Sequence, residues 1–152
     1  MYSLVRRYIK TAVVFLLIGL AIGAHILVVR EWRRVPPSAY EVSAHTHAIL
    51  VGFVMMMILG VALWMFPRPE RDDRWYHPGI AEAAYWMLVA GTTVRIAGEL
   101  LEAGGNAGVV VRAGVIGGGL LQVAGVTAFF ATMWTRIRAS GSRAREEKGE
   151  RF

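Results

Sequence analysis

The sequence of 152 residues contains no cysteine and few charges for its length. The absence of cysteine excludes disulfides, thiolate metal sites, iron–sulfur clusters, covalent attachment of c-type haem and cysteine nucleophiles. Charged residues make up 18% of the chain, whereas a soluble domain of this size carries about 25%. The side chains left to ligate a metal or a cofactor are four histidines, seven methionines and a few carboxylates.

Long apolar runs occupy most of the chain, which is 55% hydrophobic with a mean hydropathy of +0.45. Four segments exceed the roughly 18 residues that a membrane-spanning helix needs, namely residues 11–29, 44–66, 79–101 and 108–134. We therefore expect an all-α, four-transmembrane-helix polytopic bundle over residues 1–136, followed by a charged cytoplasmic tail at 137–152. A secretory signal is the rival interpretation of the first segment, but its apolar stretch is too long and lacks a clear cleavage site.

The net charge of +6 and the isoelectric point of about 10.3 would suggest nucleic acid in a soluble protein. Here the basic residues cluster at the ends of the apolar segments, so we expect a lipid bilayer and no nucleic acid as the partner. One predicted side carries Arg6, Arg7, Lys10, Arg68, Arg71, Arg74, Arg136, Arg138, Arg143, Arg145, Lys148 and Arg151, and the other carries Arg30, Arg33 and Arg34. The positive-inside rule then predicts that both termini are cytoplasmic. We expect a multi-pass protein of a prokaryotic inner membrane.

Ionisable side chains gather near the predicted outer ends of these helices. His25 lies close to the end of the first segment, and His45 and His47 lie in the first turn of the second. Arg95 and Arg112 approach the same level from the third and fourth segments. Such groups are costly in a membrane and usually functional. The sequence therefore predicts a site in this layer.

The spacing of His45 and His47 restricts what this site can hold. Residues two apart on a helix point roughly 200° from each other, so these histidines serve two sites on opposite faces, or one site and a partner helix. In a membrane protein without cysteine, the cofactor that best suits single histidines on separate helices is haem. His25 is the candidate second axial ligand, from the same or a neighbouring chain, and Arg95 and Arg112 are candidate partners for the propionates. Interfacial histidines bonded to loop carbonyls are the alternative.

These residues also carry a family resemblance. The stretch A-H-T-H-A-I-L at 44–50 resembles a histidine-bearing helix of haem-copper oxidase subunit I, and so do the residues that follow it, Gly60, Trp64, Phe66 and Pro67. The resemblance implies that His45 binds a high-spin haem and His47 a low-spin haem from the opposite face. It also extends to small four-helix proteins and nitric-oxide-related membrane proteins with an H-x-H-x-x-x-x-G-F pattern, matched here through Gly52 and Phe53.

The departures from that family limit the expected chemistry. The oxidase subunit consists of several four-helix repeats, and this chain corresponds to one of them. It lacks the further helices that bring the copper histidines, and none of its tyrosines matches the cross-linked one of the active site. A complete haem-copper centre is therefore not expected, and whether the chain is an enzyme stays open.

The sequence thus predicts a b-type haem-binding integral membrane protein for electron transfer or for binding of O2 or NO near the outer face. It would hold one or two haem b per protomer or share them between protomers. A homodimer or homotrimer is expected, because His45 and His47 cannot both face the interior of one bundle. A redox partner is implied. The alternative is a non-haem copper-binding or assembly subunit, since imidazole and thioether groups together suit copper.

Overall fold

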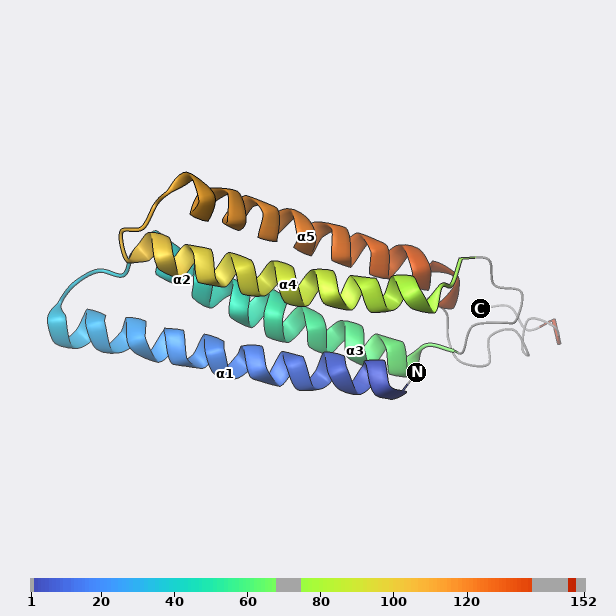
Figure 1. Cartoon of the computed structure of the whole chain (residues 1–152). Coiled ribbons are helices and arrows are strands. Elements are labelled where there is room, and N and C mark those ends of the chain that lie inside the picture. The colour runs from blue at the N-terminus through green and yellow to red at the C-terminus, as the bar shows by residue number, and fades with distance from the viewer. Residues whose placement is uncertain (1, 68–74, 138–147, 150–152) are drawn as a thin grey trace.

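The computed structural model describes residues 2–67, 75–137 and 148–149, and the regular structure in these ranges is entirely helical. Four long helical segments run alternately up and down (Figure 1). The predicted all-α bundle is therefore confirmed. The basic residues at 68–74 and the tail predicted at 137–152, apart from residues 137, 148 and 149, lie outside the described residues.

The first two segments both extend beyond the apolar runs that predicted them. The first, α1 (Tyr2–Arg33), is a single helix of 32 residues. The second begins with α2 (Ala39–His47), continues as η1 (Ala48–Met55) and ends with α3 (Met56–Met65). Backbone hydrogen bonding continues where the chain leaves the apolar layer, because a helix needs no apolar side chains to satisfy its own amides. Hydropathy therefore predicted the spans but placed both ends of the first helix and the start of the second too far inward. The second segment ends at Met65, one residue before its predicted end.

The last two segments are α4 (Pro78–Ala103) and α5 (Val109–Met133), followed by the short 3-10 turn η2 (Trp134–Arg136). Three stretches are long and apolar enough to cross a membrane, namely Ser3–Arg33, Ala39–Met65 and Val109–Arg136. The 26 residues of α4 extend about 39 Å at 1.5 Å per residue, so this helix has the required length. It is not among the three apolar stretches, and it carries the charged residues Glu82, Arg95, Glu99 and Glu102.

The second segment has a defined start and an unusual middle. Ser38 caps α2: its hydroxyl accepts from the Glu41 amide at 3.1 Å, and the Glu41 carboxylate accepts from the Ser38 amide at 2.9 Å. This reciprocal pair satisfies amides that the first turn leaves free. Directly after His47 the chain forms a π-helix of eight residues, η1. Such widened turns are rare and concentrate at functional sites.

The helices are ordered in space as they are in sequence. α1 packs along α2, η1 and α3, α4 packs on α2 and η1, and α5 packs on α4, so α1 and α5 lie on the outside (Figure 1). The N-terminus, the end of α3 and the start of α4 lie at one end of the bundle, and the connections 34–38 and 104–108 lie at the other. The outer helices expose apolar side chains such as Leu17 and Leu120, as lipid-facing surfaces require.

A buried arginine closes the end that carries the N-terminus. The Arg136 guanidinium donates to the carbonyl oxygens of Pro67 at 2.8 Å and Phe66 at 3.3 Å, and it lies 4.9 Å from the centre of the Tyr76 ring. Carbonyls at a helix C-terminus lack partners within their own helix. Arg136 therefore satisfies the end of α3 with a charge supplied from the end of α5.

Close backbone contact joins α4 to α5. A Cβ atom on Gly91 would lie 2.7 Å from the Gly118 carbonyl oxygen, and one on Gly118 would lie 2.7 Å from the Gly91 carbonyl oxygen. Neither position has room for a side chain. Small residues at helix contacts are the usual means by which membrane helices approach closely.

We predict that Gly118→Ala destabilises the α4–α5 pair. The added methyl must push the helices apart, which costs about 1–3 kcal/mol in a packed interior. Gly117→Ala is the matched control, because a Cβ there meets nothing within 4 Å and alanine favours helix over glycine. Thermal midpoints in a mild detergent should fall for Gly118→Ala and hold or rise for Gly117→Ala. Equal midpoints for the two variants would contradict the packing described.

Candidate functional site

The two histidines of α2 face different neighbouring helices. The His45 Nδ1 atom lies 2.8 Å from the carbonyl oxygen of Gly19 on α1. The His47 Nδ1 atom lies 2.8 Å from the carbonyl oxygen of Ser43 and 3.5 Å from a carboxylate oxygen of Glu99 on α4. The opposed directions predicted from their spacing are therefore present.

In both rings the Nδ1 atom lies within hydrogen-bonding distance of a backbone carbonyl oxygen, and the His47 Nδ1 atom also lies 3.3 Å from the Ser43 hydroxyl. A carbonyl oxygen can only accept a hydrogen bond, so each contact assigns the ring proton to Nδ1. In that neutral tautomer the Nε2 atom keeps its lone pair. Histidines that bind metals through Nε2 are commonly oriented by such a bond from Nδ1–H to a backbone carbonyl. His45 and His47 thus both have an imidazole nitrogen ready to act as a ligand.

α1 makes room for the His45 ring with glycine. A Cβ atom on Gly23 would lie 2.8 Å from Cε1 of His45 and 3.1 Å from its Nδ1 atom. The ring therefore occupies the space that a side chain at position 23 would fill. The Gly19–Gly23 pair, which the sequence suggests only as a packing stripe, also forms the floor beneath this histidine.

A groove of about 270 Å³ lies beside His45 and opens between α1 and α2. Its lining is apolar except for His45 at one end and an arginine that the sequence assigned only to topology; the lining residues are Gly23, Ile26, Leu27, Arg30, Val42 and His45. Arg30 lies seven residues beyond Gly23 on α1, about 10 Å along the helix axis. The groove thus combines an imidazole with a cation about two helical turns away.

A second groove, of about 360 Å³, lies on the His47 side between the second segment, α4 and α5. Its lining contains both polar and apolar side chains. The lining residues are His47, Val51, Met55, Arg95, Gly119, Gln122, Val123, Val126 and Thr127. Arg95 reaches it over the glycine surface of α5, where a Cβ on Gly119 would lie 3.0 Å from the Arg95 Nη1 atom.

Glu99 is the centre of the polar contacts on the His47 side. Its side chain is only 3% exposed. The Oε1 atom accepts from the Ser43 hydroxyl at 2.8 Å and from Nε of Arg95 at 3.1 Å. Arg95 and Glu99 lie four residues apart on α4, a spacing that brings their side chains together on one helix face. Because a buried charge is stable only when paired, these contacts explain how a carboxylate lies between apolar helices.

The contacts continue from Arg95 to α5. The Gln122 carbonyl oxygen accepts from the Arg95 guanidinium at 3.3 Å, and the Gln122 amide donates to the Thr92 hydroxyl at 3.1 Å. Gln122 and Thr92 are buried. A continuous polar chain therefore joins α2, α4 and α5 inside the bundle.

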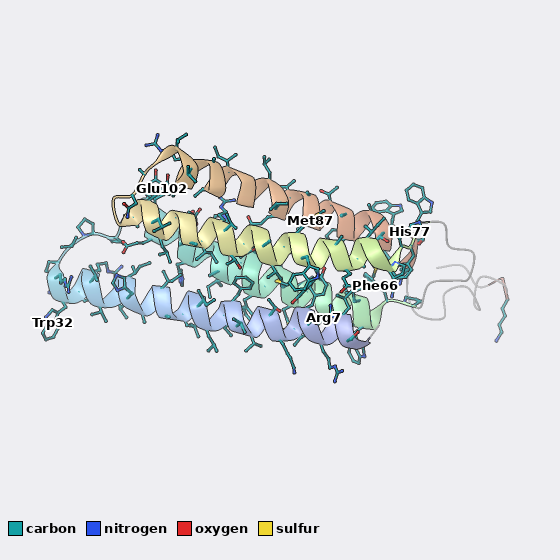
Figure 2. The ribbon with its side chains drawn as sticks, viewed as in Figure 1. Arg7, Trp32, Phe66, His77, Met87 and Glu102 are labelled. Carbon is teal, nitrogen blue, oxygen red and sulfur yellow. The ribbon has the colours of Figure 1, made fainter. Side chains whose placement is uncertain are left out.

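The other predicted site residues have different surroundings. His25 is not brought to His45: its Nε2 atom lies 3.5 Å from a Glu41 oxygen, and its side chain is 62% exposed. Arg112, at the start of α5, lies 3.9 Å from the buried carboxylate of Glu102 near the end of α4. Figure 2 places Glu102 and Trp32 at the end of the bundle opposite to His77 and Phe66.

Sequence reasoning missed three contributors to the site. Ser43 lies four residues before His47, a spacing that places it on the same helix face, so this signal was available. Gln122 was visible only as a polar residue within an apolar run, and its contact with Arg95 depends on how α4 and α5 pack. Arg30 gave no signal beyond its positive charge. Within residues 2–67, 75–137 and 148–149, no three His, Asp or Glu side chains gather as a metal-holding group.

Taken together, the fold and the site define a helical membrane protein with ligand-ready histidines on both faces of its second segment. The chain matches the family model of cytochrome c and quinol oxidase polypeptide I over residues 3–149. It therefore belongs to that family, and it is a membrane protein of the haem-copper oxidase type. No curated protein and no solved structure matches the chain significantly. The resemblance drawn from the A-H-T-H stretch is confirmed.

We predict that breaking the buried ion pair between Arg95 and Glu99 lowers the stability of the protein more than removing both of its charges. Arg95→Gln leaves the Glu99 carboxylate without its cation, and an uncompensated buried charge costs about 3–5 kcal/mol. The double variant Arg95→Gln/Glu99→Gln removes both charges and should recover most of the loss. Thermal midpoints of the wild type, the two single variants and the double variant measure this coupling. A double variant as unstable as the sum of the singles would rule out the pairing.

Proposed function

We propose that this chain is a b-type haem protein of the membrane, with His45 and His47 as axial ligands on opposite faces of the second segment. The observation that carries the proposal is the pair of Nδ1–carbonyl contacts at 2.8 Å, which leaves both Nε2 atoms free to bind iron. Family membership supports it, since the matching model describes an oxidase subunit of the haem-copper type. Haem, when bound, supplies one-electron transfer or reversible binding of O2 or NO.

The ligand count decides between these two activities. A second histidine on the haem gives a low-spin centre for electron transfer, whereas an open position allows a diatomic gas to bind. His25 remains the candidate second ligand. Its ring is 62% exposed, and it lies two residues from Gly23, which turns it about 200° from the His45 groove. It is therefore better placed to reach a neighbouring chain than its own His45.

Cations near each histidine suit the propionates of such a cofactor. Arg30 lines the His45 groove and Arg95 lines the His47 groove. Arg112, which is 65% exposed, is the remaining candidate at the rim. Arginine binds carboxylates through paired hydrogen bonds, so these side chains would orient the porphyrin edge.

A homo-oligomer, dimer or trimer, follows from the size of the two grooves. At about 270 and 360 Å³ they lie at the low end of the roughly 300–1,000 Å³ that ligand pockets span. Neither is large enough to enclose a macrocycle, and both are open on one side. The second segment has helices on both flanks, so the second wall of each site would come from a protomer that covers an open groove.

Copper binding, or a role as an accessory or assembly subunit, is the second candidate. Met55 lines the same groove as His47, and imidazole with thioether is a ligand pair that suits copper. Analysis of the purified protein that finds copper and no iron would favour this candidate. The proposal of haem requires iron.

The haem proposal predicts a specific loss in histidine variants. The purified wild type, expressed with ample haem, should show a Soret band and a reduced b-type spectrum, tested with and without carbon monoxide. His45→Ala and His47→Ala should each lower haem content and weaken association of the protomers, because ligand and second wall belong to the same site. His77→Ala is the control at the opposite end of the bundle. Absence of a Soret band from the wild type would refute the proposal.

We further propose that both termini lie in the cytoplasm of a prokaryote and that the histidine layer lies near the outer face of its inner membrane. Most of the arginine and lysine residues lie near the N-terminus, at residues 68–74 and from residue 136 onward. The positive-inside rule places these segments in the cytoplasm. A reporter fused after Phe152 should be active only as a cytoplasmic protein, and one inserted at Gly105 only as an external protein. The reverse pattern would invert the proposed topology.

A further inference from the structure

A buried carboxylate oxygen lies beside His47 and takes part in no hydrogen bond. It is Oε2 of Glu99, which lies 3.5 Å from the His47 Nδ1 atom. Among the described residues it has no hydrogen-bond partner, while its sister atom Oε1 accepts from Ser43 and Arg95. Leaving a carboxylate oxygen bare in an apolar interior costs free energy. The negative charge of this carboxylate therefore acts on the imidazole ring of His47 beside it.

His45 has no equivalent neighbour. Its Nδ1 atom donates to the neutral carbonyl of Gly19, and in the described part of the chain no acidic side chain forms an ion pair with its ring. The two histidines therefore share a tautomer but differ in charge environment. Charge effects of this kind are weakly screened away from water.

We propose that Glu99 is a positioning residue for His47, which fixes the ring and makes its Nε2 atom the more electron-rich of the two imidazole ligands. A carboxylate near Nδ1–H raises the basicity of the opposite nitrogen. Arg95 opposes this effect, but it bonds the other oxygen of Glu99, Oε1. The consequence for a metal rests on the proposed haem function. A metal centre held by the more electron-rich His47 would be more easily oxidised than one held by His45.

The ring effect can be measured without any cofactor. In the apo protein labelled with 15N-histidine, Glu99→Gln should shift the Nδ1 signal of His47 and leave that of His45 in place, with His45→Ala and His47→Ala assigning the two signals. Glu102→Gln is the matched control: this carboxylate is on the same helix, its side chain is 5% exposed, and it pairs with Arg112. An unchanged His47 signal in Glu99→Gln, or an equal shift in Glu102→Gln, overturns the proposal.

The metal effect is measured separately in the haem-loaded protein. With His45→Ala as background, Glu99→Gln should raise the ferrous-to-ferric ratio roughly tenfold at a fixed potential, which is about 59 mV for one electron. With His47→Ala as background the same substitution should change nothing. Equal shifts in the two backgrounds overturn the proposal.

A folding defect does not obscure the result. Arg95→Gln/Glu99→Gln keeps the interior neutral and removes the same carboxylate, so its apo His47 signal should also shift, and an unchanged signal overturns the proposal. A protein that binds no haem but shows the His47 shift refutes the haem function and leaves the positioning of the ring by Glu99 supported.

Discussion

The requirement that polar groups in an apolar medium find partners within the protein governs this structure. In the almost fully buried Glu99, Oε1 meets it through Ser43 on α2 and Arg95 on its own helix, whereas Oε2 has no hydrogen-bond partner among the described residues. Arg95 in turn engages Gln122 on α5. Each partner lies at a helix contact, so the position of α4 between its neighbours depends on these few bonds. Because no water is available as a substitute inside a bilayer, the charged helix α4 is stable only where α2 and α5 accompany it.

The same constraint explains why the two faces of the second segment differ. On the α1 side the contact is made by glycine and apolar residues, and His45 satisfies its ring proton with a backbone carbonyl. On the α4 side a histidine and a guanidinium line one groove, and the buried carboxylate of Glu99 contacts both of them. A helix with two histidines two positions apart thus places the His47 ring beside a buried carboxylate and the His45 ring beside a backbone carbonyl. The neighbouring helices α1 and α4 therefore make His45 and His47 chemically different.

Much of this architecture is predictable from local sequence, and the remainder depends on tertiary contacts. Apolar run length predicted four helices, because the length that a helix needs to span a membrane depends on helix geometry alone. The pairing of Arg95 with Glu99 follows equally from their i, i+4 spacing on one helix. The π-helix η1 was not predicted, since the residues 48–55 that form it would suit an α-helix equally well. The contribution of Gln122 and the place of Arg30 depend on which faces meet across helices. His25 was predicted at the correct end, but its pairing with Glu41 arises from the way α1 lies against the start of α2.

The family relation and the open grooves point to the same physical conclusion. In the four-helix unit, where α1 and α5 are outermost, an open groove lies beside each of the two histidines. Packing within the unit is tight where glycines let α5 approach α4, so the groove beside His47 has little freedom to close by moving these two helices together. Under the proposed function, these grooves would be completed from outside the unit, by a cofactor, by another copy of the chain, or by both. The proposed haem suits such a site, because a flat cofactor would offer apolar surface to both walls while the Nε2 atoms of His45 and His47 would serve as its ligands.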